Sequence, residues 1–191
     1  MSSVDDDDAL IAAALNGSAY AWEKLVKRYE SRIYNHGLRL TGNQSDAMDL
    51  MQEVFLGVYR NLHRFRGDAK FSSWIFRIAH NKAMDMNRRR SLLKPVRNEG
   101  AEEETFAAVP ADSQHEPDVK LGELRRNGEI VELLAALPFE QRLIVELKIF
   151  QSLTFDEIAV MQEISENTAK TRFYAALKKL RHISEEHHVL S

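Results

Sequence analysis

A run of basic and polar side chains near the C-terminus has the chemistry to bind nucleic acid. From Thr168 to Arg181 the chain carries five Lys/Arg and no acid. An amphipathic helix with a basic outer face, preceded by a short helix and a turn, fits the major groove of DNA. The spacing therefore predicts a helix-turn-helix. The candidate residues for contact with duplex DNA are Asn167, Lys170, Thr171, Arg172, Tyr174 and Lys178.

A second candidate site interleaves aromatic and basic side chains around residues 64–77. Aromatic rings stack on unpaired bases and neighbouring cations hold phosphates, which is the chemistry that binds single-stranded nucleic acid. Trp74 lies at helical spacing from Ile78, so we expect it in the core, whereas Phe65 is the better candidate for contact. The candidate contacts with single-stranded DNA are Phe65, Arg66, Lys70, Arg77, Asn81, Lys82 and Arg88.

The elements that must position the C-terminal site follow from caps and apolar spacing. Thr154 predicts the start of a first helix, and Ile164 marks a short turn. Ser165 is a good N-cap for a second helix that runs to about Arg181. The apolar residues of the first helix are Phe155, Ile158, Ala159 and Met161. The apolar stripe of the second is Ala169, Phe173, Ala176, Leu177 and Leu180.

The N-terminal half also shows helical spacing and no alternating strand pattern. The expected elements are a short helix that ends at Asn16-Gly17, a helix from Ala19 to Leu40, a third helix with Ser45 as its N-cap, a loop from Arg64 to Lys70 and a fourth helix from Phe71 to Arg90. The third helix is expected to bury Met48, Met51, Phe55, Val58 and Leu62. The chain is therefore predicted to be all-α.

The charges are segregated along the chain, although the formal net charge is only −3. Residues 60–97 hold eleven Lys/Arg against two acids, and residues 99–118 hold seven acids and no Lys/Arg. The acidic stretch contains Gly and Pro, has no period and reads as a flexible linker. We therefore expect two small helical domains, at residues 8–93 and 121–187, joined by a flexible acidic linker at 94–120, with the helix-turn-helix in the second domain.

Composition excludes several kinds of site. The chain has no cysteine, so it has no disulfide and no thiolate ligand. No apolar run approaches the length of a membrane span, and the start is acidic, unlike a signal peptide, so a cytoplasmic protein without membrane insertion is expected. The histidines lack metal-ligand spacing, including His182, His187 and His188 near the C-terminus. We therefore predict no metal and no cofactor.

Three groups of segments stand in the order typical of one protein family. Asp46 to Phe55 (DAMDLMQEVF) has an acid, Gln-Glu and an aromatic residue; FRG at 65–67 is followed by FSSWI at 71–75 and IAHN at 78–81; LP at 137–138, LTFDEIA at 153–159 and TAKTR at 168–172 come last. With these motifs the chain resembles the extracytoplasmic-function (ECF) sigma factors, the minimal members of the bacterial sigma-70 family, over nearly its whole length.

The resemblance implies that this protein binds core RNA polymerase and directs promoter-specific transcription initiation, in response to envelope or other stress. It implies that the third helix docks on the coiled coil of the β′ subunit, through Asp46, Asp49, Gln52, Glu53 and Phe55. The loop would capture a flipped base of the −10 element, and the C-terminal domain would bind the −35 element and the β flap. An anti-sigma factor is the further partner that the family implies, and the polymerase would carry all catalysis, so this chain is expected not to be an enzyme.

Two departures from the family pattern and two rival classes stay open at this point. Glu163 stands where a Gly is common in the turn, which predicts a different turn or a left-handed residue, and Ala169 stands where Val is common. A repressor or response-regulator output domain would also carry a helix-turn-helix, but it leaves the third-helix face and the aromatic loop unexplained. An enzyme is the other rival, and binding to core polymerase discriminates among the three.

Overall fold

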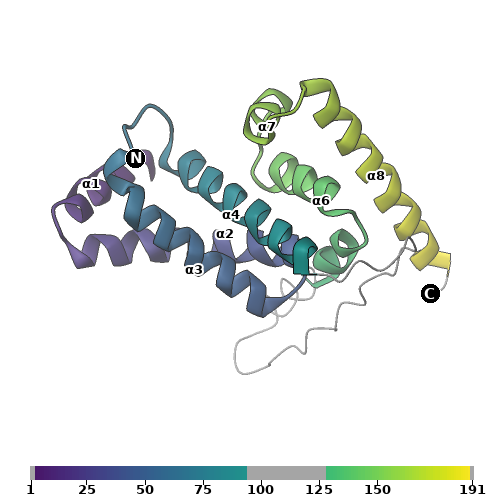
Figure 1. Ribbon diagram of the computed structural model, residues 1–191, viewed down its shortest axis with the longest axis horizontal. Coiled ribbons are helices and arrows are strands. Elements are labelled where there is room, and N and C mark those ends of the chain that lie inside the picture. Colours follow the sequence, from purple (N-terminus) through teal and green to yellow (C-terminus); the bar gives the residue numbers. More distant parts are fainter. Residues whose placement is uncertain (1–2, 94–127, 190–191) are drawn as a thin grey trace. The chain divides into compact units, whose positions relative to one another are not determined.

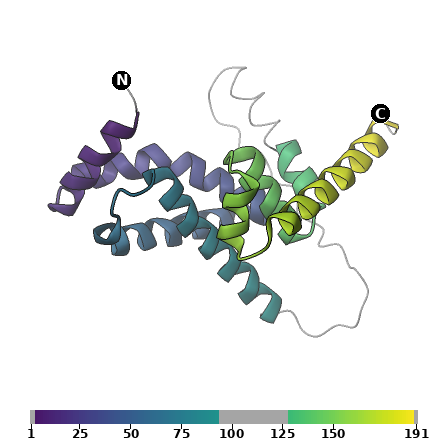
Figure 2. The same cartoon turned by 90° about the horizontal axis from the view of Figure 1, so that it is seen from above.

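The computed structural model describes residues 3–93 and 128–189, and every regular element among these residues is a helix. The chain forms two compact units (Figures 1 and 2). One unit contains residues 1–37 and 45–99, and the other contains residues 38–44 and 100–191. The prediction of an all-helical chain is confirmed for the described residues, whereas the predicted linker at 94–120 lies outside them.

The first unit is a set of long helices that bury aliphatic side chains against one another. Its elements are α1 (Ser3–Leu15), α2 (Ala19–Thr41, whose last residues belong to the second unit), α3 (Gln44–Asn61), the 3-10 turn η1 (Leu62–Arg64) and α4 (Phe71–Leu93). Burying each large aliphatic side chain contributes roughly 1.5–3 kcal/mol. The fully buried residues of this core include Leu25, Ile33, Leu50, Val54, Ile75 and Ala79.

Small residues on α2 and α3 set how closely the helices of this unit approach. A Cβ added at Gly37 of α2 would lie 3.1 Å from Ala47 Cα of α3. A Cβ added at Gly57 of α3 would lie 3.2 Å from Ile78 Cγ2 of α4. Because neither glycine has a Cβ, α3 packs closely against α2 on one side and α4 on the other.

The face that α3 buries differs from the predicted face. Its buried residues are Ala47, Leu50, Val54, Gly57 and Val58. Met48 is 42 % exposed and Met51 and Phe55 are half-buried, so the prediction was wrong for Met48, whereas Val58 and Leu62, which lies in η1, are buried as predicted. Helical spacing alone is compatible with two neighbouring apolar stripes on α3. The close packing at Ala47 and Gly57 buries the stripe that contains these two small residues. The helix also begins at Gln44, so Ser45 lies inside its first turn and is not the cap.

The second unit carries α6 (Phe139–Val145), the π-helical turn η2 (Glu146–Phe150), α7 (Phe155–Gln162) and α8 (Glu166–Val189), and residues 128–135 are helical as well. Its core includes Leu134, Leu143, Ile144, Leu147, Ile158, Ala169 and Ala176. Two buried charged side chains are held by hydrogen bonds. Arg142 donates to the carbonyls of Ala135 and Leu137 at 3.0 Å each. Glu146 accepts from Gln151 at 3.0 Å and from Arg39, which belongs to the same unit, at 2.5 Å.

Two helices, α4 and α8, run past their predicted ends, and α1, which begins at Ser3, includes the acidic run at residues 5–8. α4 continues to Leu93 and α8 continues to Val189, well beyond Arg181. Neither helix meets a Gly or Pro at its predicted end, and the chain offers nothing there to break it.

Candidate nucleic-acid and polymerase interfaces

Both predicted caps of the helix-turn-helix are present. The Thr154 hydroxyl accepts from the Glu157 backbone N–H at 3.2 Å, and the Glu157 carboxylate accepts from the Thr154 N–H at 2.7 Å, which completes a capping box at α7. These hydrogen bonds from Thr154 lower the pKa of Glu157. At α8, the Ser165 hydroxyl accepts from the Thr168 N–H at 3.0 Å. The two helices therefore begin where the sequence predicts.

The turn between α7 and α8 contains the left-handed residue that the sequence pattern suggested. Glu163 has φ 56° and ψ 40°, and the Ile164 N–H donates to the Ala159 carbonyl at 3.0 Å. A left-handed residue at this position is a common way to end a helix, and Gly adopts it at lowest cost. Glu163 takes that role here, so the turn keeps its geometry without a glycine.

The predicted DNA-contacting residues of α8 lie together on its outer surface. Asn167, Lys170, Thr171, Tyr174 and Lys178 are exposed, and Arg172 is half-buried. The opposite side of the helix packs inward through Ala169, Phe173 and Ala176, as predicted, while Leu177 and Leu180 are half-buried. The arrangement presents a polar and basic surface about three turns long, which is the chemistry required for a major-groove helix.

Several of these α8 side chains have intramolecular partners that the sequence did not reveal. Lys170 forms an ion pair with Glu166 at 2.8 Å, and Arg172 forms one with Glu140 of α6. Tyr174 is 60 % exposed and its ring lies 5.6 Å from that of Phe173. Arg172 is therefore held beside α6, while Lys170 pairs only one turn away along its own helix. Glu140 was missed because it is distant in sequence.

The loop before α4 is organised around a cluster of three aromatic rings. Phe65 lies 5.4 Å from both Phe71 and Trp74, between ring centroids, and Phe71 is buried. Phe65 and Trp74 are both half-buried, so the expected contrast between a contact residue and a core residue is weaker than predicted. Gly67 has φ 76°, a conformation that favours glycine, and it turns the chain between the exposed Arg66 and Lys70.

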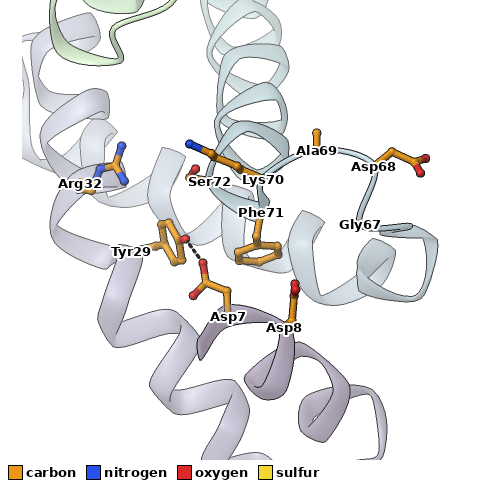
Figure 3. A pocket seen from close by; sticks show the side chains of 10 residues that line it. All are labelled: Asp7, Asp8, Tyr29, Arg32, Gly67, Asp68, Ala69, Lys70, Phe71 and Ser72. Carbon is orange, nitrogen blue, oxygen red and sulfur yellow. Dashed lines mark hydrogen bonds between the residues drawn. The ribbon is translucent and has the colours of Figure 1, made fainter. Parts of the chain in front are cut away.

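A cavity of about 410 Å³ opens beside this loop (Figure 3). Figure 3 shows Asp7 and Asp8 reaching it from α1, Tyr29 and Arg32 from α2, and residues 67–72 from the loop and the start of α4. Its walls combine aromatic rings with three carboxylates and two cations, and stacking together with hydrogen-bonding groups is the chemistry that holds an extruded base. The sequence predicted Lys70 here and missed the contribution of α1 and α2.

A buried carboxylate anchors α1 at the wall of this cavity. Asp7 is buried and accepts from the Tyr29 hydroxyl at 2.5 Å and from Arg28 at 2.5 Å. Burial, together with the hydrogen bond to Asp7, raises the pKa of Tyr29, so the phenol keeps its proton. Asp8, by contrast, is exposed at the cavity. Of these two carboxylates, Asp7 is therefore structural and Asp8 is accessible.

The outer surface of α4 carries the remaining predicted contacts with single-stranded DNA. Arg77, Asn81 and Arg88 are exposed, whereas Lys82 is half-buried and forms an ion pair with Glu53 of α3 at 3.0 Å. Arg88 lies 4.0 Å from Asp85 on its own helix. Of the predicted contacts, Phe65, Arg66 and Lys70 lie before α4, and Arg77, Asn81, Lys82 and Arg88 follow along that helix.

The predicted polymerase-binding residues lie on α3. Asp49, Gln52 and Glu53 are exposed, and Asp46 and Phe55 are half-buried. Asp46 forms an ion pair with Arg90 of α4. Three apolar side chains that the sequence did not single out for contact are exposed on the same helix, namely Met48, Leu56 and Tyr59 at 42, 47 and 66 %. This surface can therefore offer both carboxylates and apolar contacts to a protein partner.

The described residues offer no group of three or more His, Cys, Asp or Glu that could hold a metal ion. Within the same residues, no helix combines the length and hydropathy that a membrane span requires. The described residues present a helix-turn-helix with a basic outer helix, an aromatic loop beside a cavity, and an acidic helix.

Two family models match the segments that carry these surfaces. Sigma-70 region 2 matches residues 25–92, and Sigma-70 region 4 matches residues 127–180. The first match contains α3, the loop and α4, and the second contains the helix-turn-helix. The fold and the surfaces thus define a sigma-70-type transcription initiation factor.

Similar proteins show to which group of sigma-70 factors the chain belongs. The chain is 31 % identical over 168 residues to the ECF RNA polymerase sigma factor SigW of Bacillus subtilis, which covers 86 % of this chain and 89 % of the relative. It is 31 % identical over 167 residues to the ECF RNA polymerase sigma factor SigE of Mycolicibacterium smegmatis, covering 87 % of this chain but 63 % of that relative. The chain belongs to the ECF sigma factors of the sigma-70 family.

Solved structures share the fold. CnrH, solved in complex with the cytosolic domain of CnrY, superposes with a TM-score of 0.63 at 20 % identity and covers 94 % of this chain and 97 % of its own. The sigma factor RpoE of Bartonella quintana, solved with the anti-sigma factor NepR, superposes with a TM-score of 0.61 at 14 % identity, covering 85 % and 96 %. At these identities the likeness supports the fold alone.

Proposed function

We propose that this chain binds core RNA polymerase and directs initiation at specific promoters through two separate DNA contacts. The observation that carries the proposal is the pairing of a well-formed helix-turn-helix with an aromatic loop, a cavity and a basic helix on the other unit. One surface suits duplex DNA and the other suits melted DNA. A protein with both can hold a promoter while it opens.

The helix-turn-helix is assigned to the −35 element. Lys170 and Thr171 near the start of α8 are exposed and are proposed to meet base edges, with Asn167 and Tyr174 beside them. Lys178 lies two turns further along and is proposed to meet phosphate. Arg172, which forms an ion pair with Glu140, is proposed as a phosphate contact at the edge of the groove.

The loop and α4 are assigned to the −10 element. An extruded base of the non-template strand would enter the cavity beside Lys70 and Phe71, at the aromatic cluster. Extrusion costs a few kcal/mol of stacking and pairing, and contacts in the pocket offset it. The exposed Arg66, Arg77, Asn81 and Arg88 would then hold the neighbouring phosphates.

Partners other than DNA follow from the remaining surfaces. The exposed Asp49, Gln52 and Glu53, with Met48 and Tyr59 beside them, suit a basic protein surface with apolar contacts, and the β′ coiled coil of the polymerase is proposed as that partner. The β flap would contact the second unit, in which Val160 and Ile149 are exposed at 67 and 50 %. An anti-sigma factor, as in the RpoE–NepR pair, would cover such surfaces when polymerase is absent.

The proposal includes the organisation of the chain. Residues 8–93 would form the polymerase-binding and −10 domain, residues 94–120 a linker, and residues 121–187 the −35 domain. The chain would act in the cytoplasm, where its polymerase and promoters are. It would carry no covalent chemistry of its own, because RNA synthesis belongs to the polymerase.

Initiation by the reconstituted holoenzyme tests the proposal. Core polymerase with this chain should start transcripts at discrete sites in a library of genomic fragments, and core alone should not. A repressor-like protein would instead bind duplex DNA without polymerase and fail to join the core. Initiation only at fragment ends, together with absence of core binding, would refute the proposal.

A further inference from the structure

Residues of α3 that are proposed to contact the polymerase form ion pairs with basic residues of α4. Lys82 Nζ of α4 lies 3.0 Å from Glu53 Oε2 of α3, and Arg90 of α4 pairs with Asp46 of α3. The two carboxylates stand two helical turns apart on α3, and the two cations stand about two turns apart on α4, in the opposite chain direction. Two ion pairs therefore link α3 and α4 along one helix–helix contact.

Close packing fixes this register. A Cβ at Gly57, one turn beyond Glu53, would lie 3.7 Å from Lys82 Cε and 3.2 Å from Ile78 Cγ2. The aliphatic stem of Lys82 thus lies along α3 and delivers its ammonium to Glu53. Figures 1 and 2 show α3 and α4 side by side in both views. This close packing keeps the Lys82 ammonium within reach of Glu53.

The two ion pairs are weak enough for another charged group to displace one of the partners. The side chains are partly exposed, at 34 and 51 % for Lys82 and Glu53 and at 44 and 25 % for Arg90 and Asp46. The hydrogen bond from Lys82 and its charge lower the pKa of Glu53, so the carboxylate is ionised at neutral pH. Exposed ion pairs contribute little to stability, because water screens them and both side chains lose freedom. A phosphate can therefore replace the carboxylate as the partner of Lys82 or Arg90. A basic protein surface can replace the cation as the partner of Glu53 or Asp46.

We propose that Asp46 and Glu53 mask Lys82 and Arg90 in the free chain, and that a basic protein surface docking on these acids releases both cations for DNA phosphates. The inference rests on the proposed function, in which α3 meets the polymerase and α4 meets the melted strand. It adds Arg90 as a phosphate contact. It also makes DNA affinity depend on the protein partner. The same two carboxylates pair with the α4 cations in the free chain and contact the basic protein surface in the complex.

The free, full-length chain tests the masking without polymerase. The probe is a labelled single-stranded oligonucleotide of mixed sequence, titrated at several salt concentrations. Glu53→Gln should raise affinity about two- to sixfold, which is the range expected for releasing a weak ion pair. It should also steepen the salt dependence by about 0.7, the value for one added phosphate contact. Asp49→Asn removes the same charge from the same helix and is the matched control, since Asp49 forms no ion pair with the described residues.

The gain in oligonucleotide affinity must depend on the cation that the substitution releases. In the double variant Glu53→Gln/Lys82→Ala the gain should vanish, and Asp46→Asn with Arg90→Ala should give the same pattern. Equal affinities for Glu53→Gln and Asp49→Asn would overturn the masking, and so would a gain that survives Lys82→Ala. Circular dichroism of every variant checks that the helices remain folded.

The holoenzyme tests the release. Lys82→Ala/Arg90→Ala should weaken oligonucleotide binding by about twofold or less in the free chain. Once core polymerase is bound, the same change should cost about fivefold per contact at 0.1 M salt, taking a slope of about 0.7 per phosphate. Equal losses in both states would overturn the release. Failure of the wild-type chain to bind core would instead refute the proposed function, and the free-chain titration would be unaffected by that result.

Discussion

At the scale of single residues, burial decides how a side chain behaves. His80 on α4 is 3 % exposed, and its Nδ1 has no hydrogen-bond partner among the described residues. Burial, with the nearby His36 and Arg77, lowers the pKa of His80 from its ordinary 6.5 to about 4. The imidazole is therefore neutral in the folded protein at pH values where the unfolded chain binds a proton.

This burial predicts acid sensitivity of the first unit. The unfolded state binds more protons than the folded state between about pH 6.5 and pH 4, so the free energy of unfolding is highest above 6.5 and falls through that window. We expect a loss of about 2 kcal/mol between pH 7.5 and pH 5 from His80. Urea unfolding followed by tryptophan fluorescence measures it, because Trp22 and Trp74 both lie in the first unit. His80→Gln should flatten the pH dependence, and an unchanged pH dependence would contradict this account.

A second residue-scale prediction concerns base reading by α8. Lys170→Ala and Thr171→Ala should lower discrimination at single positions of the −35 element by about 1–3 kcal/mol per lost contact. Lys178→Ala should weaken binding to all sequences alike and reduce the salt slope by about 0.9. Holoenzyme binding to intact and base-substituted −35 sites separates the two outcomes. Uniform losses for Lys170→Ala and Thr171→Ala would make these residues backbone anchors.

At the scale of elements, close helix packing overrides intrinsic preference. Alanine is favoured over glycine in a helix by about 1 kcal/mol, yet Gly37 lies in the middle of α2. A Cβ there would lie 3.1 Å from Ala47 Cα and 3.2 Å from the Ala47 carbonyl oxygen. Both neighbours are backbone atoms of α3, so the whole helix would have to move.

Gly37→Ala should therefore destabilise the first unit, by about 1–3 kcal/mol from overpacking less the gain in propensity. The urea midpoint by tryptophan fluorescence should fall. Gly128→Ala is the matched control, because a Cβ at that position meets nothing within 4 Å and the residue belongs to the second unit. It should leave the tryptophan transition unchanged. A higher midpoint for Gly37→Ala would show that α3 yields easily.

At the scale of the whole molecule, the two units carry different DNA chemistries in one chain. The helix-turn-helix suits a closed duplex, whereas the loop and cavity of the first unit suit a strand that is already open. Under the proposed function, opening a promoter would depend on the first unit at the step where bases leave the stack. A defect in that step is expected to disappear when the template is opened in advance.

Phe65→Ala/Arg66→Ala should slow open-complex formation on duplex promoters and have much less effect on a template with a mismatched bubble at the −10 element. Permanganate reactivity of unpaired thymines follows the opening. Phe65 packs on Phe71 and Trp74, so Arg66→Ala alone, which removes an exposed side chain, separates DNA contact from packing. Trp74→Ala should lower thermal stability on any template. Wild-type opening rates in the double variant would exclude the loop from melting.

What the sequence determined by itself was local. The capping box at Thr154, the cap at Ser165 and the left-handed Glu163 depend on atoms within about four residues of each other, so spacing and residue type suffice to predict them. The family membership rests on the same local motifs. The sequence also placed the exposed basic residues of α8 correctly, because one apolar stripe defines its opposite face.

Only the tertiary structure decided which charges meet. Glu53 and Lys82 are 29 residues apart, Asp46 and Arg90 are 44 apart, and Asp7 and Tyr29 are 22 apart. Their pairing depends on how α1, α2, α3 and α4 pack, and hence on small contact residues such as Gly57. The buried face of α3 was decided in the same way, since two stripes were compatible with helical spacing and the fit of neighbouring helices chose one. Partners distant in the chain meet only after the core has formed, and for that reason residue spacing could not predict them.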